Sequence, residues 1–426
     1  MRQLRRTLRS AKASGLAAAL AAILLGAPGL SRAQGDSTGD TPALAAIHFY
    51  QRHLSSLRYG RCAFAPSCSE YAAQAIHTYG LLEGSALAAD RLVRCNATAA
   101  QFYSRDESGR LADPVSPGLP PVAGLRVPAW MISSGWPPSA PPASPPESAR
   151  FAETLAFANH LEQLGDCWRA STEFQRAASL AGGAATESWA FARSGACFFA
   201  LGDWGTAASA WLSAATLATD PGERAEALWM TSAARFNAGD FRATERLLEN
   251  GPQALAPTAA AAADSSLPSG GPGLGARALA LGGLCLMERG DWAQAQARFR
   301  RASGTEPDSR RRERIARMAH QAERGPDLPG RSPGLATSLS VVVPGSGQFY
   351  SGRPADGLRH LIVNGLLIAT IVHLARNEEV PAAVLVGAVA LPFYVGNVMG
   401  AGRSARQFNR GQRLDLVERT IASSER

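Results

Sequence analysis

Apolar residues recur at the 3.6-residue spacing of an α-helix in most segments of the chain, and this periodicity predicts an all-α protein. The first helix is expected to begin at Thr41-Pro42, an N-cap residue followed by proline at the first helical position. Its apolar face carries Ala43, Ile47, Tyr50, Leu54 and Leu57. The opposite face carries His48, Gln51, Arg52, Ser55 and Arg58, so the helix is amphipathic and basic.

Two more helices complete a small module over residues 41–96. Ser67-Cys68-Ser69-Glu70 matches a capping box that opens a second helix, which Gly80 ends. A third helix runs from about Gly84-Ser85 to Cys95 and places Arg91 and Arg94 one turn apart on one face. We therefore expect these two arginines to meet lipid phosphates or an acidic partner.

A proline-rich segment follows the module. Residues 113–148 include Pro137-Pro138, Pro141-Pro142 and Pro145-Pro146, which are incompatible with a regular helix. This composition predicts a semi-rigid extended linker, with binding of a partner to the proline run as the alternative.

The region 150–320 contains repeats that begin at glycine-aspartate pairs. Gly165, Gly202 and Gly239 are spaced 37 residues apart, and Gly290 follows after 51 residues. After three of these turns, equivalent positions carry alanine, an aromatic residue and alanine again. They are Ala170, Phe174 and Ala177, then Ala207, Trp211 and Ala214, and then Ala295, Phe299 and Ala302.

These repeats resemble the tetratricopeptide family, in which a glycine turn is followed by alanine, an aromatic residue and a final proline, here Pro307. The period is a few residues longer than the usual ~34. The resemblance implies stacked helix pairs whose concave surface binds a protein partner, with a spacer that binds nothing as the alternative.

The C-terminal region 335–402 is hydrophobic. Residues 358–375 and 380–400 each approach the ~20 residues of a spanning helix, and Arg376-Asn377-Glu378-Glu379 forms the turn between them. The preceding string Val343-Pro344-Gly345-Ser346-Gly347-Gln348-Phe349-Tyr350 resembles the signature of small TM2-type bacterial membrane domains, and its glycines predict close helix packing or a re-entrant bend. The arginines that follow residue 402 favour a cytoplasmic tail. This orientation requires a third crossing at 335–350 if the repeats are exported.

The N-terminus predicts export. Met1–Lys12 is rich in arginine, Leu16–Leu25 is apolar, and Ser31-Arg32-Ala33 offers a small-residue cleavage site, so residues 1–33 are expected to be a signal peptide. The net charge of +8 is carried almost wholly by arginines near hydrophobic segments and is not accompanied by a nucleic-acid motif. We therefore expect membrane lipid rather than nucleic acid as a partner, at a bacterial inner membrane with most of the chain in the periplasm.

The module carries a specific motif: Arg61-Cys62-Ala63-Phe64-Ala65-Pro66-Ser67-Cys68-Ser69-Glu70-Tyr71, followed by Gly80, Gly84-Ser85, Arg91 and Arg94-Cys95. It closely resembles the YidD family of membrane protein insertion efficiency factors. Asp113-Pro114-Val115 echoes the distal D-P-V of that family, whereas Asn96-Ala97 replaces its usual His-Pro. The resemblance implies structural or binding roles for the motif residues Arg61, Cys62, Phe64, Pro66, Cys68, Ser69, Tyr71, Gly80, Gly84, Ser85, Arg91, Arg94 and Cys95. It also implies proximity to the insertion machinery, although family members are usually cytoplasmic.

The three cysteines of the module leave several chemistries open. Cys68 lies beside a helix N-terminus, where the dipole favours a thiolate. Packing or a disulfide, redox or metal chemistry, and catalysis are all compatible with the residues, but no histidine stands at finger-like spacing and no metal or other cofactor is predicted.

We therefore predict a non-enzymatic accessory factor in membrane-protein insertion or envelope biogenesis. An envelope scaffold that binds a partner through its repeats is one alternative, and a periplasmic thiol enzyme is another.

Overall fold

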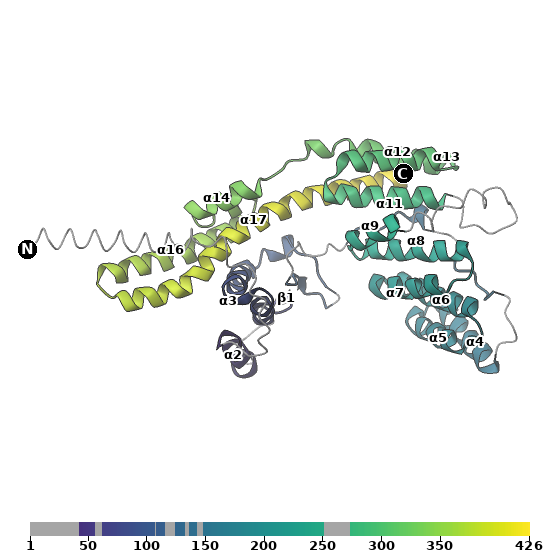
Figure 1. Cartoon of the computed structure of the whole chain (residues 1–426), viewed down its shortest axis with the longest axis horizontal. Helices are drawn as coiled ribbons and strands as arrows, with labels where there is room; N and C mark the ends of the chain where they lie inside the picture. Colours follow the sequence, from purple (N-terminus) through teal and green to yellow (C-terminus); the bar gives the residue numbers. More distant parts are fainter. Residues whose placement is uncertain are drawn as a thin grey trace, which may run out of the picture. The chain divides into compact units, whose positions relative to one another are not determined.

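The computed structural model describes residues 42–55, 62–106, 108–115, 124–132, 136–142, 148–250 and 273–426. These residues are mostly helical with almost no strand, which confirms the predicted all-α class (Figure 1). A short parallel pair, β1 (Phe64–Ala65) and β2 (Leu111–Ala112), is the one sheet in this part of the chain. The predicted signal peptide at 1–33 and the motif residue Arg61 lie outside the described residues.

The chain divides into two compact units, Met1–Ser56 and Leu57–Arg426. The described part of the first unit is α2 (Pro42–Phe49), which continues into the π-helical turn η1 (Tyr50–Leu54). Helix formation in this segment was predicted. Leu44 is buried in it, and Phe49 and Leu54 are exposed.

The second and third predicted helices of the module form one kinked element, α3 (Cys68–Arg94). Ser67 caps its N-terminus by accepting a hydrogen bond from the backbone amide of Glu70, as the capping box predicts. Gly80 breaks the helix with φ 78°, a left-handed conformation that side chains other than glycine disfavour. A Cβ atom on Gly84 would overlap the backbone of Ile76, so glycine here lets the two halves fold closely together.

Antiparallel helix pairs form the repeat region, with the glycine-aspartate pairs at their turns. Each turn glycine has a positive φ, and Asp166, Asp203 and Asp240 cap the following helices by accepting backbone N–H groups. The repeated small and aromatic positions are all fully buried. The helices are α4 (Ala149–Gln163), α5 (Cys167–Leu180), α6 (Ala184–Leu201), α7 (Trp204–Leu217), α8 (Pro221–Asn237), α9 (Phe241–Asn250), α11 (Leu274–Arg289), α12 (Trp292–Thr305) and α13 (Ser309–Ala322).

The described part of the proline-rich segment is not a free spacer. Leu125, Val127 and Met131 are buried in the same core as the repeats, the last of them in the 3₁₀ turn η4 (Ala129–Met131). The backbone amide of Val127 donates to Asn237 Oδ1 at 2.7 Å, and Arg277 donates to the carbonyl of Met131 at 2.9 Å. The prediction of an extended spacer is thus wrong for 124–132, because apolar residues among the prolines bind it to the repeat core.

The C-terminal region consists of two short and two long helices. They are α14 (Pro333–Val342), α15 (Ser346–Tyr350), α16 (Pro354–Arg376) and α17 (Val380–Glu425), and the 3₁₀ turn η5 (Gly325–Asp327) precedes them. Another 3₁₀ turn, η3 (Ala99–Gln101), follows α3 in the module. Both α16 and α17 are long and apolar enough to cross a membrane. At 1.5 Å per residue, α14 is only about 15 Å long, roughly half of a bilayer's hydrocarbon core.

Polar side chains attach the short helices to α17. Gly345 has φ 90° between α14 and α15, and its amide donates to Asn397 Oδ1 at 2.8 Å. Gln348 Nε2 donates to the carbonyl of Asn397 at 2.9 Å, and Ser340 Oγ donates to Gln348 Oε1 at 3.0 Å. The glycine-rich string therefore forms the close helix packing that is one of the two outcomes its composition predicts.

The second half of α17 packs against α11 and α13 of the repeat region. Leu416 and Val417 are buried in the repeat core, and Arg410 Nε pairs with Glu288 at 2.6 Å. If α16 and α17 cross a membrane, the tail and the repeats must therefore lie on the same side of it. This arrangement requires an even number of crossings and contradicts the three-crossing hypothesis.

Epitope tags test this topology. We expect protease added to one face of the membrane to remove tags placed after Gly182 and after Arg426, and to leave a tag after Glu378 intact until detergent is added. Removal of the Gly182 and Arg426 tags from opposite faces would contradict two crossings.

Candidate docking site of the cysteine module

The second half of α3 lies directly on α17. The contact is made at Gly396 and Gly400, where a Cβ would lie 2.5 Å from the carbonyl oxygen of Ala86 and would overlap the carboxylate of Asp90. Two glycines four residues apart form one face of a helix and let another helix approach closely. The cysteine module is therefore seated on the apolar part of the C-terminal hairpin.

A buried carboxylate joins the two elements. Asp113 is fully buried and accepts from Arg91, from Arg94 Nη1 at 2.8 Å and from Arg403 Nη2 at 2.6 Å. Arg91 and Arg94 come from α3, and Arg403 comes from α17. Arg94 Nε also pairs with Asp90 at 2.7 Å. One aspartate thus holds three guanidinium groups of two helices.

The start of α16 makes a second set of contacts with the module. Asn96 Nδ2 donates to Asp356 Oδ1 at 2.7 Å, and Asp356 pairs with Arg353 at 3.1 Å. The guanidinium of Arg353 lies 4.2 Å from the centre of the Phe102 ring. His360 Nε2 lies 3.5 Å from Asp90 Oδ1. Both helices of the hairpin therefore hold the module.

The charges of this cluster are fixed by their neighbours. Burial alone would raise the pKa of Asp113, but Arg94, Arg403 and Arg91 outweigh it and hold the pKa below its ordinary value of 3.8. Asp90 behaves alike: burial raises its pKa, and Arg94 and other nearby groups lower it further than burial raises it. Both aspartates are therefore ionised at neutral pH.

This geometry corrects the expected role of the arginines. Arg91 and Arg94 are almost completely buried, so they cannot meet lipid phosphates or an outside acidic partner. They share one face of α3, as the spacing predicts, but the acidic groups that they meet belong to the same chain. They are structural residues of the docking site.

Three other motif residues surround Arg91, and two serines of the motif bond within α3 and its cap. Its guanidinium lies 3.8 Å from the ring centre of Phe64 and 4.8 Å from that of Tyr71, and it donates to the carbonyl of Pro66 at 3.1 Å. Ser69 lies 3.4 Å from Ser67 at the helix cap, and Ser85 Oγ donates to the carbonyl of Leu82 in the turn after Gly80. The repeat glycines Gly165, Gly202, Gly239 and Gly290 do not take part in this site, since they serve the turns of the repeats.

The three cysteines of the module are brought together as thiols. The Sγ atoms of Cys62, Cys68 and Cys95 lie within 4.8 Å of one another, and Cys62 and Cys68 are 3.5 Å apart. A hydrogen bond with Cys95 and burial both raise the pKa of the Cys68 thiol. The helix dipole therefore does not make Cys68 a thiolate in this state, contrary to the sequence argument, because the other two sulfurs and burial outweigh the dipole.

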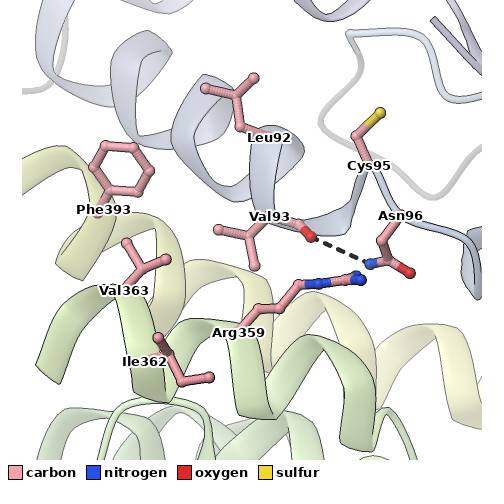
Figure 2. Close-up of a pocket in the computed structure, with 8 residues that line it drawn as sticks. All are labelled: Leu92, Val93, Cys95, Asn96, Arg359, Ile362, Val363 and Phe393. Atoms are coloured by element: carbon pink, nitrogen blue, oxygen red, sulfur yellow. Dashed lines mark hydrogen bonds between the residues drawn. The ribbon is translucent and has the colours of Figure 1, made fainter. Parts of the chain in front are cut away.

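A groove of about 420 Å³ opens where α3 meets the hairpin (Figure 2). Apolar side chains from α3, α16 and α17 line it, with one cation, Arg359. The Nη1 atom of Arg359 is buried and finds no hydrogen-bond partner among the described residues. Cys95 also lines the groove, and in Figure 2 its sulfur points away from Arg359 and Ile362.

Sequence reasoning missed much of this site. It noted Asp113 only as an echo of a family motif, and it did not single out Asp90, Asp356, His360 or Arg353. The glycine spacing at 396 and 400 within an apolar segment is a signal that could have indicated close helix contact there.

The helices and the buried charges together define a membrane-associated helical protein, in which buried ion pairs attach a small cysteine module to an apolar hairpin. The family model described as "Putative membrane protein insertion efficiency factor", YidD, matches residues 40–105. The chain belongs to this family through its cysteine module, which confirms the resemblance seen in the sequence.

Individual relatives carry the same description. The protein from Moorella thermoacetica is 47% identical over 64 residues, which are 15% of this chain and 91% of that protein. The protein from Oleidesulfovibrio alaskensis is 41% identical over 71 residues, 17% of this chain and 83% of that protein. These matches concern the module and leave the repeats and the hairpin unaddressed. No solved structure matches the chain.

The Asp113→Asn variant tests the charge cluster. It leaves three buried guanidinium groups without their shared counter-charge, and breaking a buried pair in this way costs about 3–5 kcal/mol. We expect the free energy of unfolding, measured by proteolysis in a urea series on the detergent-solubilised chain, to fall by that amount.

Asp415→Asn is the matched control, because it removes the same charge from an exposed i,i+4 pair on α17. Since the pKa of Asp113 is lowered, its contribution should be complete above about pH 3.8 and decrease as the pH falls further. Equal stability of the two variants would contradict a structural role of Asp113.

Proposed function

We propose that this chain is a non-enzymatic accessory factor in membrane-protein insertion, whose family module acts while docked on the hairpin of its own chain. The observation that carries the proposal is the buried contact between Asp113 and Arg403, because it fixes the module to a helix that can cross a membrane. A module held in this way stays at the bilayer without depending on reversible lipid binding.

The contacts of the cysteines support a role without turnover. The pKa of Cys68 is raised, so the thiol lacks the activated thiolate of a thiol enzyme. The repeats offer stacked helices that we propose as a site for a protein partner, such as a component of the insertion machinery. An envelope scaffold that uses these repeats alone is the second candidate.

We further propose that the soluble parts lie on the periplasmic face of a bacterial inner membrane. The signal-like N-terminus supports this orientation. Because α17 packs on the repeats, we then expect the tail on the periplasmic face too, in place of the cytoplasmic tail that its arginines favour. With this orientation, protease added to spheroplasts removes a tag placed after Arg426; protection of that tag would place the soluble parts in the cytoplasm instead.

Undocking the module tests its function. A leucine at Gly400 would collide with Asp90, so in Gly400→Leu cells we expect the yield of inserted membrane proteins, followed by pulse-labelling and protease protection, to fall to that of cells lacking residues 49–95. Gly387→Leu is the control, because that glycine of α17 has open space around it.

The two candidate functions give different outcomes in this experiment. Normal insertion in cells lacking residues 49–95, with loss of a complex that is captured through the repeats, would support the scaffold and contradict the insertion role. Normal insertion with Gly400→Leu alone, in a chain shown to be undocked, would contradict the need for docking.

We propose anionic phospholipid as the ligand of the groove beside the docked module. Its apolar lining fits an acyl chain, and the unpartnered Nη1 of Arg359 fits a phosphate.

In Arg359→Gln we expect fewer phosphatidylglycerol molecules to be retained in native mass spectra. Arg376→Gln, which removes an exposed cation at the other end of α16, should retain them. Equal retention by both variants, or equal retention of phosphatidylcholine by the wild type, would contradict this site.

A further inference from the structure

The cysteine cluster is assembled from three separate places in the module. Cys62 precedes β1, Cys68 is the first residue of α3, and Cys95 caps the other end of the same helix. The helix is 27 residues long, so its two ends would be far apart if it were straight. The break at Gly80 and the close contact at Gly84 fold it back and bring the three sulfurs within 4.8 Å of one another.

The spacing of the sulfurs suits a bound cation better than a disulfide. A disulfide holds its sulfurs about 2.05 Å apart, whereas Cys62 and Cys68 are 3.5 Å apart and unbonded. A cation at the usual zinc–sulfur distance of about 2.3 Å separates its thiolate ligands by roughly 3.8 to 4 Å. The 3.5 Å between the sulfurs of Cys62 and Cys68 is close to that separation, and all three sulfurs lie within 4.8 Å of one another.

The donor set also selects the class of ion. Three thiols, with no carboxylate or imidazole in the group among the described residues, favour soft cations such as zinc and copper(I) over magnesium or calcium. The cysteine spacing in the sequence did not indicate a metal, because the ligands come from a loop, a helix start and a helix end rather than from one short motif.

We propose that Cys62, Cys68 and Cys95 form a three-thiolate site for a thiophilic cation of the zinc or copper(I) class. On binding, each thiol releases its proton to solvent and its sulfur forms one bond to the ion, with no change in oxidation state. The positive end of the α3 dipole at Cys68 stabilises the excess negative charge. The bound ion would connect the loop before β1 to both ends of α3 and so hold the folded-back helix closed.

Metal titration of the full-length chain in detergent and a phosphine reductant tests the proposal. We expect one zinc ion per chain in competition with a chromophoric chelator, or one copper(I) ion in competition with bathocuproine disulfonate. Binding by either ion supports the site, and the ion that is retained against the stronger competitor identifies the class. Cys68→Ser should lose the ion, whereas Cys285→Ser, a buried cysteine of the repeats, should keep it.

Protection of the thiols provides a test that does not depend on variants. In the wild-type chain, bound metal should protect Cys62, Cys68 and Cys95 from alkylation, as mapped by mass spectrometry, and should leave the alkylation of Cys167 unchanged. Absence of saturable binding by the reduced wild type, equal loss of the ion in Cys285→Ser, or protection of cysteines outside the cluster would each overturn the proposal.

Discussion

The buried carboxylate of Asp113 is the interaction on which the arrangement of the second unit depends. A carboxylate taken out of water is strongly disfavoured unless opposite charges and hydrogen bonds replace its hydration. Asp113 obtains these at Oδ2 from Arg91 and Arg94 of α3 and at Oδ1 from Arg403 of α17, so both carboxylate oxygens have charged partners only when the module and the hairpin are together. Burying these charges costs free energy, so the cluster adds little net stability. Its main effect is to favour one arrangement of the module and the hairpin over others.

The backbone around the cluster is shaped to allow these ion pairs. Arg403 can reach Asp113 because α17 and α3 approach closely at Gly396 and Gly400, where any side chain would separate them. The same helix then continues beyond the apolar segment and packs on α11 and α13. A continuous α17 thus connects the hairpin, the module and the repeats, and it places the tail beside the repeats.

Local features of the fold could be predicted from the sequence, and contacts between distant segments could not. The repeat turns follow from glycine at a left-handed position and aspartate at an N-cap, which act within a few residues. The capping box and the break at Gly80 are equally local. By contrast, Asp113 and Arg403 are 290 positions apart, and nothing in the neighbourhood of Arg91 shows that its counter-charge is internal. The burial of Leu125 and Val127 also depends on the distant surface of the repeats. The neighbouring prolines alone therefore suggest a spacer, although this segment is packed.

The departure from the family pattern at Asn96 becomes meaningful in this setting. Asn96 stands where the resemblance has histidine, and its amide donates to Asp356 at the start of α16. An amide is a neutral donor at every pH, whereas a histidine would change its charge near neutrality beside a carboxylate. The substitution therefore removes one titratable group from this contact with the hairpin. Amphipathic helices and single lipid contacts hold a protein at a membrane only reversibly. If the hairpin crosses a membrane, a module attached to it through Asn96 and Asp113 stays at the bilayer independently of lipid composition and ionic strength.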